Sequence, residues 1–456
     1  MRIVLTGATG FVGQPLARHL VARGHELVAL SRDLHGATAK LPTRCRCVAW
    51  EPTSGRLDAN AIAGADAIIH LAGEGVGDKP WTADRKQEIL SSRTDTSRTL
   101  VSTIRDLAPA RRPKALISAS AIGFYGDRGQ EVLDEQSAPG EGFLAEVCKA
   151  WEHETRAAAD LGLRAAVIRI GIVLGKDGGA LAKMLPPFQL GVGGRLGDGS
   201  HWMSWIHIDD LVALFAQAVE STTWPSVVNG VAPNPLTNAD FTKALGAALR
   251  RPTLIPVPRF ALNLALGEMS SLLFASQRVL PTAAQGAGFT FQYPTIDGAL
   301  AQIFDGVHEI DAEQWIDHPL DAVFAFFSDA RNLERLTPAF LKFRVLGSST
   351  PTLRKGTLID YQLSLHGLPI RWQSRIESWQ AGKQFVDVQV RGPYRLWQHT
   401  HDFEEYRGGT IVRDRVRYQL PLGGFGDVLG SALVKRDLQQ IFAFRRQQMR
   451  EIFGAA

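Results

Sequence analysis

The chain has 456 residues, of which 45% are hydrophobic and 21% carry charged side chains. This length exceeds what one hydrophobic core normally supports, so two or three domains are expected, and the composition excludes a disordered chain. The net charge of +4 and the isoelectric point near 9.0 are modest, and no run of lysine or arginine indicates a nucleic-acid partner. The three cysteines, Cys45, Cys47 and Cys148, imply a reducing compartment.

The chain opens on a strand-like segment, MRIVLTGATG, without a charged leader and an apolar stretch, so no signal peptide is expected. The longest apolar segment, residues 260–275, contains Glu268 and is too short to cross a bilayer, so it is predicted to be a packed helix. We therefore expect a cytoplasmic protein without a membrane span. Basic residues near the C-terminus recur at helical spacing and are predicted to form a solvated helix face. They are Lys435, Arg436, Arg445, Arg446 and Arg450.

Up to about residue 300, short apolar segments alternate with helical ones. Helices are predicted at 15–23 and 83–107. The apolar segments are typical of strands covered on both faces, and their alternation with helices predicts an α/β, doubly wound parallel sheet. The predicted strands are RIVLTG, ELVALS, CVAW, AIIHLAG, ALISAS and AAVIRIGIVLG.

After about residue 304 the pattern changes. A strand at HEIDAEQWI and one or two helices at DAVFAFFSDARNLERL precede a series of strands separated by glycine-containing turns, and a long helix at 426–453 follows. This order is α+β and does not continue a parallel sheet, so a domain boundary is predicted near residues 298–308. The strands of the series are TLIDYQLSL, IRWQSRIESW, QFVDVQV, WQHTHDFEEY and TIVRDRVRYQL.

A glycine-rich turn, TGATGFVG, follows the first predicted strand directly. Gly7 permits a sharp turn, Gly10 lets the backbone approach a pyrophosphate, and Gly13 permits close packing of helix on sheet. The position of this spacing after an N-terminal strand predicts a dinucleotide site. A turn without a ligand is the alternative.

The second predicted strand ends in VALSRD. An enzyme that prefers NAD usually has a carboxylate here for the ribose hydroxyls, whereas Ser31 and Arg32 offer a hydroxyl and a guanidinium suited to a 2′-phosphate. The stretch therefore predicts NADP. Asp33 is the alternative, because it could serve an NAD ribose, although it lies later than expected and beside a cation.

The stretches TGATGFVG, DAIIHLAG and SWIHIDDL resemble the extended short-chain dehydrogenase/reductase family. FLAEVCKAWE, RIGIVLGKDGGAL, VVNGVAPNPLTNADF, PTLIPVPRFAL and the longer segment HLAGEGVGDKPWTADRKQEILSSRTDTSRTLV resemble its atypical, NADP-binding, epimerase-like branch. This resemblance implies a Rossmann-type domain over residues 1–300, with a C-terminal cap at about 229–297 and a substrate lobe built from segments around 175–204 and 229–290.

The resemblance also implies which residues contact the cofactor. Leu71 and Ala72 would line the adenine and ribose side, Arg93 would serve a phosphate, and Val173 would lie near the nicotinamide. Glu88 shares the helix of Arg93, and an exposed helical pair of the two is the alternative, although a spacing of i, i+5 is poor for a salt bridge. The full predicted cofactor set is Gly7, Thr9, Gly10, Phe11, Val12, Ser31, Arg32, Leu71, Ala72, Glu88, Arg93 and Val173.

Members of the extended family use a Ser or Thr together with a Tyr-x-x-x-Lys pair, in which the tyrosine moves a proton while hydride moves to or from nicotinamide. The matching helix here is FLAEVCKAWE. One register puts Leu144 and Cys148 in the Tyr and Lys positions, the other puts Ala145 and Lys149 there, and neither restores the pair.

The candidate catalytic residues that remain are Ser120 and Tyr125. The spacing from Ser120 to the FYG stretch is one residue longer than usual, and Tyr125 belongs to a turn whose role is mainly structural. Cys148 could donate a proton, but a lone buried cysteine is more often a small hydrophobic residue. His207 is predicted to begin a helix, with Asp209 and Asp210 in its cap and first turn.

Residues 305–456 resemble the START-like, polyketide-cyclase-type (SRPBCC) ligand-binding superfamily, mainly in IDHPLDAVFAFFSDARNLERLTPAFLKFRVL, in RGPYRLWQHTHDFEEYRGGTIVRDRVRYQLP and in the closing helix. This resemblance implies a helix-grip fold with an apolar cavity between a curved sheet and the last helix. Three tryptophans, Trp372, Trp379 and Trp397, can wall such a cavity or fill a core.

Two sets of polar residues share a strand face in this half. His399 and His401 could begin a metal site, but no third ligand has a recognisable spacing, so no metal is predicted. Arg413, Arg415 and Arg417 are predicted to pair with nearby carboxylates.

The sequence is compatible with two functions. The first is an NADP-dependent oxidoreductase or epimerase-like enzyme with a non-standard proton donor, acting on a small-molecule substrate that the ligand-binding half might present. The second is a catalytically reduced NADPH-binding sensor or carrier of an apolar ligand. The missing tyrosine favours the second, whereas the nucleotide end and the substrate lobe favour the first.

Overall fold

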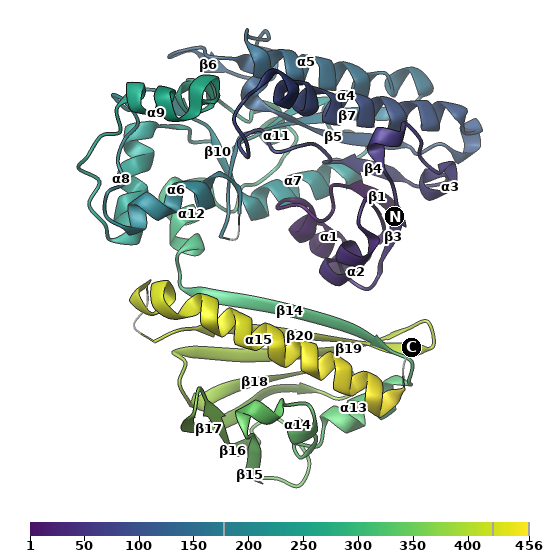
Figure 1. Ribbon diagram of the computed structural model, residues 1–456. Helices are drawn as coiled ribbons and strands as arrows, with labels where there is room; N and C mark the ends of the chain where they lie inside the picture. Colours follow the sequence, from purple (N-terminus) through teal and green to yellow (C-terminus); the bar gives the residue numbers. More distant parts are fainter. Residues whose placement is uncertain (177, 422–423, 455–456) are drawn as a thin grey trace. The chain divides into compact units, whose positions relative to one another are not determined.

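The computed structural model describes residues 1–176, 178–421 and 424–454. The chain divides into two compact units, residues 1–303 and 304–456, which are described separately (Figure 1). No helix in these described ranges is both long and apolar enough to cross a membrane.

The first unit is built on a seven-stranded sheet in which every neighbouring pair is parallel, in the order β11-β7-β5-β4-β1-β2-β3. This confirms the predicted Rossmann-type α/β class. The strand β11 was not predicted, because VVNG is short. The strands are β1 (Arg2–Thr6), β2 (Glu26–Ser31), β3 (Cys45–Ala49), β4 (Ala67–His70), β5 (Ala115–Ala121), β7 (Arg164–Ile170) and β11 (Val227–Gly230).

Alternate residues of these strands enter two separate cores, one on each face of the sheet. Ile3 and Leu5 pack in the core that also holds residues of α1 and α7, whereas Val4 packs with residues of α3 and α4. Figure 1 shows helices on both faces. The continuous apolar runs in the sequence follow from this two-sided burial. The helices are α1 (Gly13–Ala22), α3 (Ala59–Ile62), α4 (Ala83–Asp106) and α7 (Ile208–Glu220).

The segment AAVIRIGIVLG was predicted as one strand, but it divides at Gly171 into β7 and β8 (Ile172–Leu174). A Cβ on Gly171 would lie 2.6 Å from the carbonyl oxygen of Ser204, so the chain passes too close to its neighbour for any side chain. Beyond this point β8 leaves the main sheet and pairs with β10 (Trp205–His207).

The rest of the first unit forms smaller helices and two further short pairings, β9 with β12 and β6 with β13. The packed helix predicted at 260–275 is wrong, because the segment breaks at Gly267 (φ +57°) into α9 and α10. No residue of α9 is buried, and the side chains of Phe260 and Leu264 are 75% and 89% exposed. The remaining elements are α2 (Leu34–Lys40), β6 (Val132–Leu133), α5 (Phe143–Arg156), α6 (Gly179–Gln189), β9 (Trp202–Met203), β12 (Leu236–Thr237), α8 (Asn238–Leu249), α9 (Arg259–Leu266), α10 (Ser271–Phe274), β13 (Arg278–Val279), α11 (Thr282–Gly286) and α12 (Ile296–Ile303).

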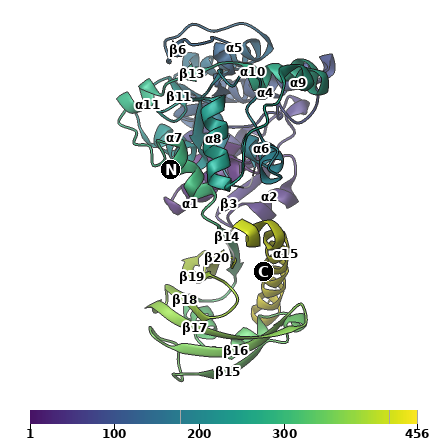
Figure 2. The same cartoon turned by 90° about the vertical axis from the view of Figure 1, so that its left-hand side faces the viewer.

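The second unit is a seven-stranded antiparallel sheet in the order β14-β20-β19-β18-β17-β16-β15, with the long helix α15 (Gly424–Phe453) packed across it (Figures 1 and 2). This confirms the predicted α+β helix-grip fold. The strand β15 was missed. The other elements are β14 (Val307–Ile316), α13 (Leu320–Phe327), α14 (Asn332–Arg335), β15 (Arg344–Ser348), β16 (Leu358–Leu365), β17 (Leu368–Gln380), β18 (Gln384–Arg391), β19 (Leu396–Tyr406) and β20 (Gly409–Gln419).

Candidate functional site

The strand order of the first unit locates a crevice. From β1 the sheet continues in one direction through β2 and β3, and in the other through β4, β5 and β7. In doubly wound sheets, ligands bind outside the carboxyl ends of the strands at the point where the order reverses. That point lies between β1 and β4, where Gly7 and Leu71 follow the two strands.

The glycine-rich turn has the close contacts that its spacing predicts. Gly7 has a φ of +67°, and a Cβ there would lie 2.9 Å from backbone atoms of Leu71. A Cβ on Gly13 would lie 2.1 Å from the Gly7 carbonyl oxygen. Gly10 itself is exposed. The turn thus leaves exposed backbone at the amino end of α1, where the helix dipole favours a phosphate.

The loop after β4 is held against this turn by one buried hydroxyl. Thr6 Oγ1 accepts hydrogen bonds from the backbone N–H groups of Leu71 and Ala72, each at 3.2 Å, and lies 2.7 Å from His70 Nδ1. Burial lowers the pKa of His70 to about 3, so this histidine is neutral. Leu71 and Ala72 are partly exposed beside the turn.

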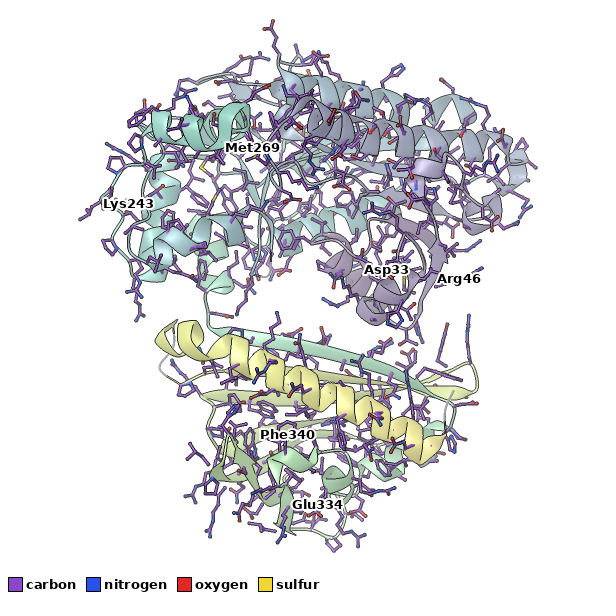
Figure 3. All side chains as sticks on the ribbon, viewed as in Figure 1. Asp33, Arg46, Lys243, Met269, Glu334 and Phe340 are labelled. Carbon is purple, nitrogen blue, oxygen red and sulfur yellow. The ribbon has the colours of Figure 1, made fainter. Side chains whose placement is uncertain are left out.

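The end of β2 distinguishes the two alternatives for the ribose. The Asp33 carboxylate accepts from the backbone N–H of Gly36 at 2.9 Å and caps α2, at the start of which it lies (Figure 3). Ser31 Oγ bonds to the backbone of Asp33. The Arg32 side chain is 67% exposed, and its guanidinium lies 3.9 Å from the Glu74 carboxylate. Arg32 is therefore available to a ligand, whereas the Asp33 carboxylate is occupied.

Glu88 and Arg93 do not form the exposed helical pair that was the alternative. Arg93 donates to the carbonyl oxygens of Ile89 and Glu74, each at 2.9 Å, and its guanidinium lies 5.1 Å from the Trp151 ring centroid. Burial lowers the pKa of Arg93. The exposed Glu88 carboxylate pairs instead with Arg85 at 2.8 Å.

Arg85 is a residue that the sequence analysis missed. It is 5% exposed and donates to the Gly75 carbonyl oxygen at 2.7 Å. Together with Arg93 it braces the loop of Gly73 to Gly75 from the side of α4. Only the spacing of basic residues along α4 could have indicated this role.

Val173 and Phe11 meet on the far side of the glycine-rich turn. Cβ atoms placed on Gly178 and Gly179 would each lie 2.7 Å from the Phe11 ring, and one on Gly179 would lie 3.1 Å from the Val173 carbonyl oxygen. The glycines of this loop therefore make room for the Phe11 ring. The structure thus brings Phe11 and Val173 together, while Thr9 and Val12 lie in the same partly exposed turn.

The hydroxyls of Ser120 and Tyr125 lie in one buried network. Ser120 donates to Glu152 at 2.9 Å, and Glu152 accepts two hydrogen bonds from Arg169, at 2.8 and 3.0 Å. Arg169 also donates to the Tyr125 hydroxyl at 2.9 Å, which lies 2.8 Å from Asn229 Oδ1. Tyr125 is 0% exposed, and burial raises its pKa. These contacts hold both hydroxyls within the buried network.

The register of β5 explains why Ser120 faces this network. Ser118 and Ser120 are both buried, whereas Ala121 is partly exposed at the end of the strand. Because successive strand residues point to opposite faces, Ser118 and Ser120 share one face of β5 and Ala121 points to the other.

On α5, Leu144 and Cys148 face the turn that follows β5, at Ile122–Tyr125, and Lys149 does not. A Cβ on Gly123 would lie 3.2 Å from Leu144 Cβ and 3.7 Å from Cys148 Sγ. Lys149 pairs with Glu146 one turn earlier and is partly exposed. These contacts place Leu144 and Cys148 on the packed face of α5 and Lys149 toward its surface.

We expect Cys148 to resist alkylation in the folded protein. Burial, and then the neighbouring Glu152 carboxylate, raise the pKa of its thiol to about 11, so the thiolate is scarce at neutral pH. Cys47 is only partly buried, and a hydrogen bond from Cys45 lowers its pKa to about 7. Iodoacetamide at pH 8, followed by peptide mass mapping, should modify Cys47 and leave Cys148 free. Equal modification of the two would contradict the buried placement.

The helix that follows β10 begins as predicted. His207 is its N-cap and accepts from the Asp209 N–H, and both aspartates lie in the first turn. The Asp210 carboxylate accepts from the backbone N–H groups of Gln292 and Tyr293, at 2.7 and 3.0 Å. It therefore fastens the segment at the end of the first unit.

The second unit contains a cavity between its sheet and α15, with about 1270 Å³ of empty space, its open mouth included. Trp372 and Trp397 line it, whereas Trp379 stacks on Phe385 in the core, so the tryptophans serve both predicted uses. Most of the wall is apolar. The polar part includes Asp387, His399, His401 and Arg445.

The arginines of β20 and Arg445 of α15 differ in their surroundings. Arg413, Arg415 and Arg417 each have a carboxylate within 4.0 Å, as predicted. Arg445, however, is not part of the solvated face of α15. It is 8% exposed and lies 3.2 Å from Asp414, because α15 presents this residue to the sheet.

His399 and His401 have the third partner that the sequence spacing did not supply. Asp387 lies on the neighbouring strand, with its Oδ1 3.1 Å from His401 Nε2. Burial alone would lower the pKa of His401, but hydrogen bonds to Asp387 and Asp414 outweigh it and raise the pKa. The pKa of His399 is lowered by burial and by His401.

The fold and the two sites define a Rossmann-type dinucleotide-binding protein joined to a helix-grip domain. The chain belongs to the epimerase family: the model described as "NAD dependent epimerase/dehydratase family" matches residues 3–229. A domain of unknown function, DUF1731, matches residues 257–303, and "Polyketide cyclase / dehydrase and lipid transport" matches residues 316–444.

Several relatives are similar over the first two thirds of the chain's length. An Arabidopsis thaliana protein, "Epimerase family protein SDR39U1 homolog, chloroplastic", is 41% identical over 66% of this chain and 86% of its own length. YfhF of Bacillus subtilis is 37% identical over 66% of this chain and 98% of its own length. The crystal structure of human SDR39U1 with NADPH is 33% identical, with a TM-score of 0.59, and covers 66% of this chain and 99% of that one.

Proposed function

We propose that the first unit binds NADP(H) in the crevice between β1 and β4. The observation that carries this proposal is the end of β2, where the Asp33 carboxylate caps α2 while the Arg32 side chain is 67% exposed. An exposed guanidinium suits a 2′-phosphate, whereas an NAD ribose needs a free carboxylate. The NADPH in the human SDR39U1 structure supports the same cofactor here.

The remaining predicted residues fit this cofactor. The turn from Gly7 to Val12 would hold the pyrophosphate, Leu71 and Ala72 would line the adenine and ribose side, and Val173 would lie near the nicotinamide. Arg93 contacts the loop after β4 directly, and Glu88 pairs with Arg85, which also contacts that loop. Arg93 remains the proposed phosphate partner. The nicotinamide supplies hydride chemistry when bound, and these residues orient it.

We further propose that this unit is an oxidoreductase or epimerase-like enzyme whose active site lacks the Tyr-x-x-x-Lys pair. Leu144 and Cys148 occupy the α5 positions that face the turn after β5, and neither offers an acid or base suited to neutral pH. Ser120 and Tyr125 remain catalytic candidates, although their hydroxyls are bonded within the network of Glu152 and Arg169. A proton would then come from the substrate itself or from water.

The second candidate function is an NADPH-binding sensor or ligand carrier with little catalysis. The hydrogen-bonded hydroxyls of Ser120 and Tyr125 favour this second function, and so does the cavity with an apolar wall in the second unit. To separate the two functions, the purified chain would be analysed for bound nucleotide, and NADPH absorbance would be followed against a panel of carbonyl compounds. Oxidation above the rate without protein supports the enzyme, and tight binding without oxidation supports the sensor.

We expect Arg32→Ala to weaken NADPH binding by about 10- to 100-fold, because charge-assisted hydrogen bonds to a phosphate contribute roughly 1.5–3 kcal/mol. NADH, which has no 2′-phosphate, should bind almost unchanged. Isothermal titration with both nucleotides measures the ratio. A matched control is Arg18→Ala, on α1 outside the proposed site. Equal weakening of NADPH and NADH by Arg32→Ala would exclude this residue as the 2′-phosphate ligand.

For the second unit we propose an apolar small-molecule ligand in the cavity. Its wall, which includes Trp372, Trp397, Leu336 and Phe343, is largely apolar, as in binding pockets for drug-sized ligands. Mass spectrometry of organic extracts from the purified chain would identify such a ligand. We keep the cytoplasm as the proposed compartment, which fluorescence microscopy of a tagged chain would test.

A further inference from the structure

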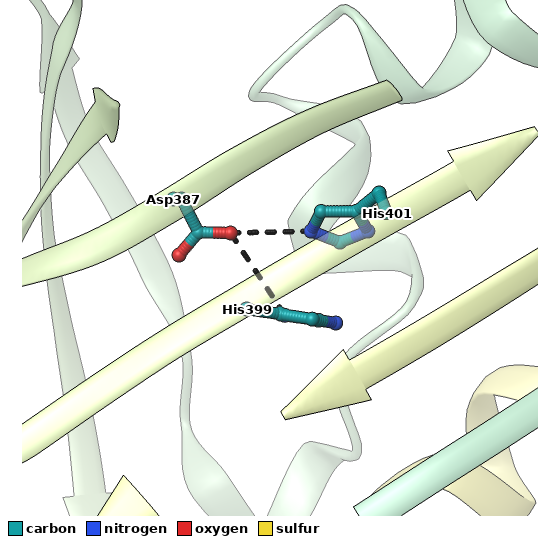
Figure 4. A group of neighbouring side chains, drawn as sticks. All are labelled: Asp387, His399 and His401. Atoms are coloured by element: carbon teal, nitrogen blue, oxygen red, sulfur yellow. Dashed lines mark hydrogen bonds and ion pairs between the residues drawn. The ribbon is translucent and has the colours of Figure 1, made fainter. Parts of the chain in front are cut away.

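One polar cluster in the cavity wall is not explained by binding an apolar ligand. Asp387 on β18 faces His399 and His401 on β19 (Figure 4). The Asp387 Oδ1 lies 3.1 Å from His401 Nε2 and 3.9 Å from His399 Nδ1, and one ligand atom from each of the three residues lies within 4.8 Å of the other two. His399 and His401 share a strand face because they are two residues apart.

The opposite ring nitrogens of both histidines are held by one carboxylate. Asp414 Oδ1 lies 2.9 Å from His399 Nε2 and 2.8 Å from His401 Nδ1. Arg445 on α15 lies 3.2 Å from the same oxygen and fixes it in place. Each imidazole therefore has one nitrogen anchored by Asp414 and the other directed toward Asp387.

We propose that Asp387, His399 and His401 form a site for a divalent first-row transition-metal ion of the zinc type, with a further position open to the cavity. Two imidazoles and one carboxylate are a common ligand set for such ions, with bonds of about 2.0–2.2 Å. Ligand atoms around an ion at that distance lie roughly 3–4 Å apart, close to the 3.1 and 3.9 Å observed.

Asp414 and Arg445 have the arrangement of residues that position metal ligands. Histidines that bind metals usually donate their other N–H group to a carboxylate, which fixes the ring and raises its basicity. Here a single buried carboxylate, 6% exposed, serves both rings. A metal on this wall would bind an oxygen-bearing group of the cavity's ligand, so the ligand class would be an apolar molecule with one polar oxygen.

The competing explanation is a hydrogen-bonded cluster that never binds metal, and direct titration distinguishes the two. The chelator-treated full-length chain would be titrated with ZnCl₂ and with CoCl₂. We expect one metal ion per chain after gel filtration, and visible cobalt absorption without the near-ultraviolet band of a thiolate ligand. A thiolate band would assign the metal to Cys45 and Cys47 and overturn the proposal, as would a chain that retains no metal.

Variants identify the ligands. His399→Ala should abolish stoichiometric binding, and Asp387→Asn, which is nearly isosteric and keeps the fold measurable, should weaken it at least tenfold. Asp414→Asn should weaken binding by about 10- to 100-fold. Two control variants should leave metal binding unchanged. They are His153→Ala, which removes an exposed histidine, and Cys47→Ser, which removes a thiol. Unchanged affinity in Asp387→Asn, with a normal melting curve, would overturn the assignment. NADPH titration of the same variants reports separately on the first unit.

Discussion

Glu152→Ala should destabilise the first unit by about 3–5 kcal/mol, since it leaves the Arg169 guanidinium buried without its counter-charge. The Glu152 and Arg169 side chains are 0% and 3% exposed, and two hydrogen bonds join them. The substitution also removes the acceptor of the Ser120 hydroxyl. Guanidinium unfolding followed by circular dichroism, with the transition of the first unit fitted separately, measures the loss.

The matched control is Glu146→Ala on the same helix. Glu146 pairs with Lys149 on the surface, where ion pairs contribute little, so its loss should cost less than about 1 kcal/mol. If Glu152→Ala were no more destabilising than the control, the buried network would not be a structural element.

Gly10→Val should weaken NADPH binding by about 100-fold, or ~2.7 kcal/mol, while leaving the fold intact. Gly10 is exposed, its φ does not require glycine, and a Cβ there would lie 3.2 Å from the Gly7 carbonyl oxygen, a contact that needs only a small adjustment. The side chain would instead occupy the space that a pyrophosphate needs above the turn. Fluorescence titration of NADPH measures the loss.

Two other glycines make this result interpretable. Gly286→Ala lies far along the chain, with nothing within 4 Å of the added Cβ, and should change neither binding nor melting temperature. Gly13→Ala should lower stability as well as binding, because its Cβ would lie 2.1 Å from the Gly7 carbonyl oxygen. Normal NADPH affinity in Gly10→Val would place the cofactor elsewhere.

Ser120 and Tyr125 show how tertiary contacts determine the surroundings of residues in a sequence motif. In the sequence, Ser120 and Tyr125 lie where an extended short-chain dehydrogenase keeps a serine and a turn tyrosine. In the fold, the Ser120 hydroxyl donates to Glu152, and Tyr125 receives a hydrogen bond from Arg169. Neither Glu152 nor Arg169 is near them in sequence, so no local pattern predicts the network.

The sequence alone determined the architecture of both units and the place of the nucleotide turn. Short apolar runs, glycine spacing and alternation of polar and apolar residues are local properties, and they specify strands, turns and faces before any packing is known. Predictions from these local properties were wrong in two places. The apolar segment that contains α9 was predicted to be one packed helix, and the segment that breaks at Gly171 was predicted to be one strand.

Only the tertiary structure decided which charged groups meet. Asp33 is committed to α2, Arg445 is buried against Asp414, and Asp387 joins two histidines from a neighbouring strand. Register between strands and the rotation of a helix set these contacts, and both depend on burial summed over many residues. Spacing within one segment could therefore show His399 and His401 on a common face, but it could not supply their third partner.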